Sequence, residues 1–280
     1  MRRWLLASIA GVSAVTFAQI ASAADLPRKA PAAPPPPPVY SWTGFYAGAN
    51  IGGGWGNRDV DYAPNDPLIA SFFVTTGPAL PTSFRSSGVV GGLQLGYNWQ
   101  LNRSWLVGLE TDFDWSGIKG SSSPSGHLNL QGGGSTYTMT ADERVKWFGT
   151  VRARLGYLPM DNLLLYATGG FAYGNVEHNG AYNNLGPVGI TVGGPLPFAL
   201  NCFAATTCYA GSSSKTAGGW TAGAGLEYAF APKWTLKGEY LYVSLDGQSV
   251  IESALPNSSF TANFGRTNFN VARAGVNYRF

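Results

Sequence analysis

The last thirteen residues of the chain, NFNVARAGVNYRF (Asn268–Phe280), alternate between apolar and polar side chains. Ala272, Ala274, Val276 and Tyr278 occupy every second position before the terminal aromatic ring. A period of two is typical of a β-strand, because successive side chains of a strand point to opposite faces of its sheet. The stretch therefore predicts a strand that holds the C-terminus in a sheet.

Seven further segments repeat this alternation, and each is about ten residues long. Their apolar rows run through Phe45–Trp55, Val89–Trp99, Trp105–Trp115, Val145–Tyr157, Leu165–Tyr173, Trp220–Phe230 and Trp234–Tyr242. This length fits a tilted strand that crosses a bilayer.

The connections between these segments alternate in length. The tight ones are QLNR, LPMDN and APK, and the long ones cover about Asn57–Arg85, Ser116–Glu143, Val176–Ser214 and Leu245–Thr267. Short turns at one rim and long loops at the other are typical of outer-membrane barrels. We therefore predict an all-β fold: an eight-stranded antiparallel up-and-down transmembrane β-barrel with four long extracellular loops and short periplasmic turns.

The N-terminus reads as a targeting segment. Arg2 and Arg3 precede an apolar run, and the A-x-A pattern at Ala21–Ala23 predicts a signal peptide over residues 1–23, cleaved after Ala23. Residues 24–41 are proline-rich and predict an extended periplasmic linker, and residues 42–280 form the predicted barrel. Beyond the N-terminus no apolar stretch of about 18 residues predicts a transmembrane helix. The net charge of only +3 gives no support to nucleic-acid binding.

Alternation alone leaves the orientation of the rows open, because a soluble barrel with an apolar interior also alternates. Here the charged residues keep to the polar rows, as a lipid-facing apolar row requires. An eight-stranded lumen is just wide enough for side chains, and buried charges need partners. We therefore expect an interior ion-pair network of Glu110, Asp112, Asp114, Lys146, Arg152, Arg154, Glu227, Lys237, Glu239 and Arg273 that plugs the barrel.

Aromatic residues lie at the ends of the apolar rows, beside either the short turns or the long loops. Rings at these positions are expected at the two membrane interfaces. The predicted aromatic belts contain Trp55, Trp99, Trp105, Trp115, Trp147, Tyr157, Trp220 and Trp234.

Three motifs carry a family resemblance: WTGFYAGANIGGGWG at Trp42–Gly56, GLQLGYNW at Gly92–Trp99, and the C-terminal strand with Val276, Tyr278 and Phe280. The chain resembles the small outer-membrane β-barrels, which include the OmpA-like eight-strand barrels, and most closely the outer-membrane immunogenic proteins of Gram-negative bacteria. The resemblance implies a place in the cell outer membrane, a C-terminal signal read by the barrel-insertion machinery, and exposed antigenic loops with adhesion or haem binding. The expected partners are outer-membrane lipid and lipopolysaccharide, the insertion machinery and periplasmic chaperones, and no nucleic acid.

Candidate catalytic residues are few. His127 and His178, with Ser123, Ser125 and Glu177 near them in the sequence, raise the alternative of a lipid-modifying enzyme, and a narrow channel is the other alternative. No strained G-x-S-x-G turn is present, and nothing in the sequence fixes nucleophile, base and orienting group together. We therefore expect no enzymatic activity and no catalytic, cofactor or metal site.

The two cysteines, Cys202 and Cys208, fall in the third long loop. In an exported protein the expected state of such a pair is a disulfide.

Overall fold

The computed structural model describes residues 40–65, 82–130, 133–184, 209–255 and 258–280. The chain divides into two units, Met1–Pro38 and Val39–Phe280. The first unit lies outside the described residues, and with it the signal peptide, its cleavage after Ala23 and most of the 24–41 linker. The predicted domain bounds therefore stay predictions. Within the described residues, no helix has the length and apolar character needed to span a membrane.

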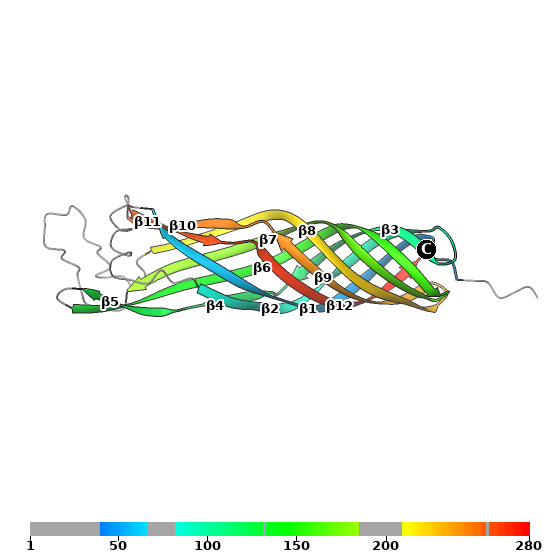
Figure 1. The fold of residues 1–280 in the computed structure, drawn as a ribbon, viewed down its shortest axis with the longest axis horizontal. Coiled ribbons are helices and arrows are strands. Elements are labelled where there is room, and N and C mark those ends of the chain that lie inside the picture. Colours follow the sequence, from blue (N-terminus) through cyan, green and yellow to red (C-terminus); the bar gives the residue numbers. More distant parts are fainter. Residues whose placement is uncertain (1–39, 66–81, 131–132, 185–208, 256–257) are drawn as a thin grey trace, which may run out of the picture. The chain divides into compact units, whose positions relative to one another are not determined.

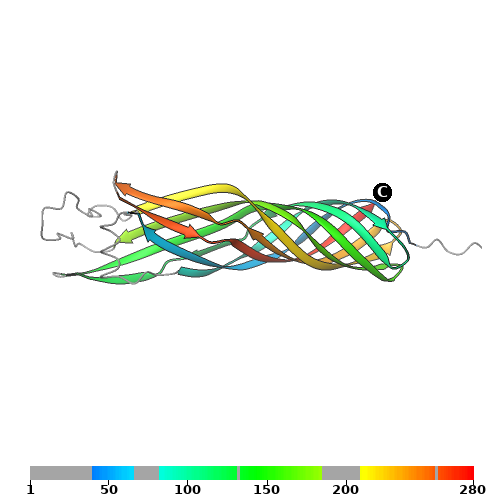
Figure 2. The ribbon, with the colours of Figure 1, turned by 45° about the horizontal axis from the view of Figure 1, so that its top comes forward.

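Twelve β-strands make up the described part of the second unit (Figures 1 and 2). They are β1 Gly44–Pro64, β2 Thr82–Gln100, β3 Trp105–Ser116, β4 Lys119–Ser122, β5 Ser125–Leu130, β6 Gly133–Met160, β7 Leu163–Asn184, β8 Tyr209–Ala231, β9 Trp234–Leu245, β10 Gln248–Leu255, β11 Ser258–Phe264 and β12 Thr267–Arg279.

Eight of these strands close a barrel. The antiparallel pairs β1–β2, β2–β3, β3–β6, β6–β7, β7–β8, β8–β9, β9–β12 and β12–β1 return to the starting strand. Three tight turns, after β2, β6 and β8, lie at the same end as the C-terminus, which we call the short-turn end. This arrangement confirms the predicted eight-stranded antiparallel up-and-down barrel.

The barrel continues at its other end, which we call the far end, beyond the eight predicted crossings. There β4 replaces β3 between β2 and β6, and β10 and β11 replace β9 and β12 between β8 and β1. The strands therefore form a second ring, the upper barrel, which Figure 1 shows at the end opposite the C-terminus. The predicted bounds of the long loops were too wide, because much of these ranges is strand: β1 runs on to Pro64 and β2 already begins at Thr82.

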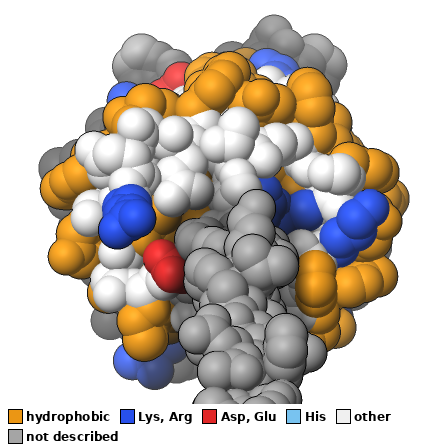
Figure 3. Space-filling view, turned by 90° about the vertical axis from the view of Figure 1, so that its right-hand side faces the viewer, with side chains coloured by type: hydrophobic (Ala, Val, Ile, Leu, Met, Phe, Trp, Pro, Cys, Tyr) orange, Lys and Arg blue, Asp and Glu red, His pale blue; other side chains and the backbone are white. Residues whose placement is uncertain are grey.

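Apolar side chains cover the outside of the eight-stranded ring at the short-turn end, which we call the lower barrel. Phe45, Leu93, Leu109 and Leu226 each expose at least half of their surface. Between Phe45 and Trp55, ten residue steps of a tilted strand span about 25 Å, the height of the apolar band of an outer-membrane barrel. Figure 3, which looks onto the short-turn end, shows hydrophobic side chains around much of the circumference.

Glycines on the inner face let neighbouring strands approach closely. A Cβ atom on Gly170 would lie 2.1 Å from the carbonyl oxygen of Val151, and one on Gly92 would lie 2.1 Å from that of Phe113. No side chain fits at these distances. Because glycine has no side chain, the space in the lumen remains available to the long charged side chains of the neighbouring strands.

Candidate functional site

Charged side chains from five strands meet inside the lower barrel. β3 and β6 lie next to each other, and alternate residues of both strands point into the lumen. None of the side chains in this group is more than 5% exposed. The group, which we call the ion network, contains Glu110, Asp112, Asp114, Arg152, Arg154, Glu227, Lys237, Glu239 and Arg273.

Two arginines hold the upper half of the ion network together. The guanidinium of Arg273 lies 2.5 Å from Asp114, 2.6 Å from Asp112 and 2.6 Å from Glu239. Arg152 lies 2.7 Å from Asp112 and 3.0 Å from Glu239. Each arginine bridges acids from different strands, so the contacts tie opposite walls of the barrel together.

The lower half of the ion network centres on Arg154. Its guanidinium donates to Glu227 at 2.9 Å and to the hydroxyl of Tyr46 at 2.6 Å. Tyr46 in turn donates to Glu110 at 2.7 Å, and Lys237 donates to the same carboxylate at 2.8 Å. Hydrogen-bonded partners of opposite charge offset the high cost of burying ions.

The ion network contains five carboxylates and four cations, and so carries one formal negative charge. Loss of a cation would therefore leave the remaining charges further out of balance, whereas loss of one acid would bring them closer to balance. The arrangement can hold the strands in register and fill the lumen.

Lys146 is not part of the ion network, contrary to the prediction. The register of β6 against β7 shifts between Val145 and Trp147, so two successive side chains fall outside the regular alternation. Lys146 is 42% exposed and pairs with Glu177 at 3.2 Å, while Val145 is fully buried in the lumen rather than on the lipid-facing row. A bulge adds one residue to a strand, and alternation read from the sequence cannot locate it.

Two apolar layers lie on either side of the ion network, and neither was predicted from the sequence. The lower apolar layer, at the short-turn end, contains Trp42, Leu106, Leu158, Leu164, Tyr166 and Ala229, and Trp42 Nε1 donates to the Asp161 carbonyl at 2.9 Å. The middle apolar layer, on the far side, contains Val90, Ile118, Val145, Phe148, Ala172, Val176, Ala217, Leu241, Val243, Leu245, Phe269 and Val271. The sequence does contain a signal for these layers, namely runs of adjacent apolar residues such as Leu241, Tyr242 and Val243. Such runs break the apolar–polar alternation, so they indicate apolar side chains on both faces of the strand.

A second buried polar group lies in the upper barrel. Arg58 bonds Glu143, and His178 Nδ1 lies 3.6 Å from the same carboxylate. The ring of His178 packs on Phe264, with centroids 4.2 Å apart. Burial, and to a lesser extent the charge of Arg58, lowers the pKa of His178 to about 4. The imidazole is therefore neutral at physiological pH.

The candidate catalytic residues do not converge in the described part of the chain. His178 points into the lumen, whereas the adjacent Glu177 pairs with Lys146 on the opposite face of the strand. Ser125 Oγ lies 3.0 Å from Thr138 Oγ1 on the neighbouring strand. Ser123 is exposed, and the side chain of His127 lies outside the described residues.

The predicted belt residues all point outward. Trp55, Trp99, Trp105, Trp115, Tyr157, Trp220 and Trp234 are 44–59% exposed, and Trp147 is half-buried against Phe113 at a centroid separation of 5.4 Å. Of the predicted C-terminal signal, Val276 on β12 and the terminal Phe280, which follows β12, are exposed, and Tyr278 on β12 is half-buried. Cys202 and Cys208 lie outside the described residues, so their disulfide stays a prediction.

Similarity to known proteins at the level of sequence agrees with this architecture. A family model described as "Outer membrane protein beta-barrel domain" matches residues 7–280. The 31 kDa outer-membrane immunogenic protein of Brucella melitensis is 39% identical over 287 residues, which cover 100% of both chains. The 25 kDa outer-membrane immunogenic protein of the same organism is 24% identical, over 97% of this chain and 96% of the relative. Among solved structures, OprG from Pseudomonas aeruginosa aligns with a TM-score of 0.44 and 12% identity, over 87% of this chain and 99% of that chain.

Proposed function

Because this chain belongs to the outer-membrane β-barrel family of Gram-negative bacteria, we propose that it is a non-enzymatic integral protein of the outer membrane. Its lower barrel anchors the chain in lipid, and its upper barrel presents an extracellular surface. The sealed lumen contributes to envelope integrity, because it adds no leak to the membrane.

The stacking of side chains along the lumen is the observation that carries this proposal. On β6 alone, the buried Leu158 belongs to the lower apolar layer, Arg152 and Arg154 to the ion network, and Phe148 to the middle apolar layer. Water and ions passing through would have to displace both apolar layers and the paired charges between them. Close-packed interiors resist such displacement.

The non-enzymatic role is supported by the placement of the histidines and serines. Acyl transfer and hydrolysis need a nucleophile and a base within hydrogen-bond reach of each other. Among the described side chains, His178 contacts a carboxylate and a phenyl ring, and its ring is buried away from the lipid-facing surface.

Surface presentation is supported by the relatives whose names describe them as immunogenic. The upper barrel carries the extracellular hairpins, and these are the parts that an antibody would meet. Adhesion or haem binding, which the family resemblance implies, would belong to this same surface.

The test is conductance in planar bilayers, with the refolded full-length mature barrel. We expect no steady open-channel steps, and no swelling of proteoliposomes in small sugars. Steady porin-type steps would overturn the sealed lumen. Unchanged lipid A mass spectra in cells carrying His127→Ala and His178→Ala are expected, and loss of a lipid A modification in these cells would overturn the non-enzymatic role.

A further inference from the structure

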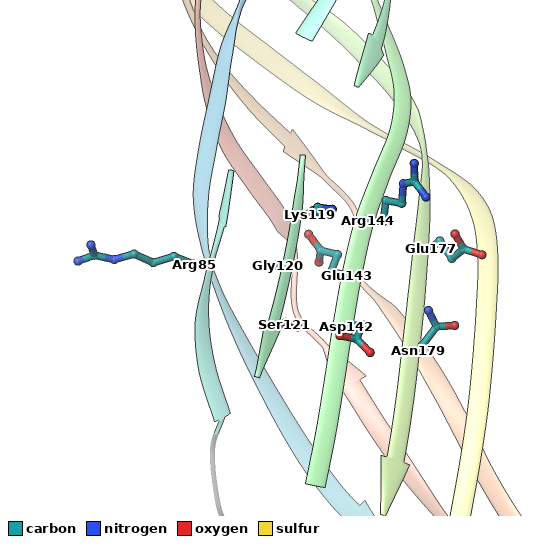
Figure 4. A pocket seen from close by; sticks show the side chains of 9 residues that line it. All are labelled: Arg85, Lys119, Gly120, Ser121, Asp142, Glu143, Arg144, Glu177 and Asn179. Carbon is teal, nitrogen blue, oxygen red and sulfur yellow. The ribbon is translucent and has the colours of Figure 1, made fainter. Parts of the chain in front are cut away.

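A groove on the outer wall of the upper barrel is lined by charged side chains (Figure 4). Its volume is about 620 Å³, and β2, β4, β6 and β7 form its floor. Lys119 and Arg144 lie at one end, and Asp142 and Asn179 lie at the other. We call Lys119, Arg144 and the nearby Lys146 the basic cluster.

Two cations of the basic cluster sit directly opposite each other. Lys119 on β4 pairs in register with Arg144 on β6, and both side chains are exposed on the same face. Like charges at directly opposed positions destabilise a sheet. Within the described part of the chain, neither Lys119 nor Arg144 forms an ion pair, whereas every cation of the ion network does. The pair is therefore suited to an external anion.

The acids of the groove leave the basic cluster with excess positive charge. Glu177 pairs with Lys146, and Glu143 is buried and bonds Arg58 on the inner side of the wall. Asp142 remains exposed, two register positions farther from the membrane than the opposed pair.

The basic cluster lies just beyond the outer aromatic belt. Trp115 and Trp147 are register partners that face the lipid, and Lys119 follows Trp115 by four residues on the same wall. On the continuous strand β6, Arg144, the register partner of Lys119, lies three residues beyond Trp147, the register partner of Trp115. Three steps along a tilted strand raise the backbone by up to about 8 Å above the belt. Lipid phosphates lie at this height, immediately outside the belt that marks the membrane interface.

We infer that the basic cluster binds the phosphate groups of an anionic lipid in the outer leaflet, whose acyl chains lie along the belt below. The inference rests on the proposed function as a membrane-anchored barrel. A lipid fits better than a soluble polyanion, because the groove opens on the side wall next to the membrane and not at the far end of the barrel.

The experiment measures the affinity of the purified mature barrel, in neutral detergent with EDTA at 0.15 M salt, for bisphosphoryl lipid A. The variant Lys119→Gln/Arg144→Gln should bind about 30-fold more weakly, since each cation near a lipid surface contributes about a fivefold factor. The matched control Arg103→Gln/Lys215→Gln removes two exposed cations elsewhere and should bind within twofold of wild type. Lipid A lacking both phosphates should bind wild type as weakly as the variant binds the phosphorylated form.

A second readout separates binding from folding. In vesicles of phosphatidylcholine alone, Lys119→Gln/Arg144→Gln should melt at or above the temperature of wild type, because the opposed charges no longer repel. Equal affinity of variant and wild type for bisphosphoryl lipid A would overturn the inference. So would variant-sensitive binding of a soluble sulfated polysaccharide with no such binding of lipid A. Neither result would affect the conductance test of the sealed lumen.

Discussion

Arg273 and Arg152 each contact three acids of the ion network, and replacing Arg273 by methionine removes the one of the two whose contacts are all 2.6 Å or shorter. Its guanidinium lies within 2.6 Å of Asp112, Asp114 and Glu239, and each of these side chains is fully buried. Methionine keeps much of the side-chain length and removes the charge and all the donors. We expect the barrel to lose stability through uncompensated negative charge and not through a cavity.

The magnitude follows from the charges that remain. The ion network changes from five carboxylates against four cations to five against three, and Asp114 loses its ion-pair partner. Breaking a buried pair by removing one partner costs about 3–5 kcal/mol. Asp114→Asn, which removes an acid from the same contact, should cost less than about 1 kcal/mol because it brings the charges into balance.

The assay is reversible urea unfolding of the refolded barrel in lipid vesicles, followed by tryptophan fluorescence. Arg266→Met is the matched control, since Arg266 pairs with Asp246 at 3.3 Å while both side chains are more than half exposed. Surface pairs contribute about 0–1 kcal/mol. If Arg273→Met and Arg266→Met unfold within 1 kcal/mol of each other, the reasoning about the ion network is wrong.

Three further predictions concern other parts of the lumen. Trp42→Ala should open the short-turn end and raise the access of a periplasmic thiol reagent to a cysteine introduced in the lower barrel; unchanged labelling would contradict its role as a seal. Gly170→Ala should lower stability by about 1–3 kcal/mol, whereas Gly169→Ala, with 3.6 Å to the nearest atom, should be tolerated, and equal urea midpoints would contradict this. Because the folded pKa of His178 lies near 4 against 6.5 for a free histidine, its neutral form supplies stability above pH 6.5 that is lost as pH falls toward 4. His178→Phe should remove about 3 kcal/mol of that acid dependence in urea titrations, and an unchanged pH profile would count against it.

Much of the lower barrel was accessible from the sequence. Alternation with a period of two placed Arg152 and Glu239 on inward faces and Leu93 and Trp115 on outward faces, because a strand has only two faces and lipid excludes charge from one. The aromatic belts were also predictable from the lipid environment, because aromatic rings favour the two interfaces where lipid meets water.

The upper barrel could not be read in the same way. Above the membrane the inner face of a strand still packs in an apolar cluster, which includes Val60 and Phe264, but the outer face meets water. No lipid-facing row of apolar residues therefore marks these strands in the sequence. The long hairpins around β10 and β11 were therefore predicted as loops, although they complete a second ring.

The sequence by itself determined which residues carry charge, that these alternate with apolar ones, and hence that eight strands enclose a charged lumen. Only the tertiary structure decided which charges meet: Asp114 and Arg273 lie 159 residues apart, and their contact depends on how the barrel closes. The tertiary structure also decided that, at the bulge in β6, the side chain of Lys146 lies outside the barrel and that of Val145 lies in the lumen. Periodicity is a local property of each strand, whereas the contacts across a closed barrel depend on the register of every strand pair around the ring.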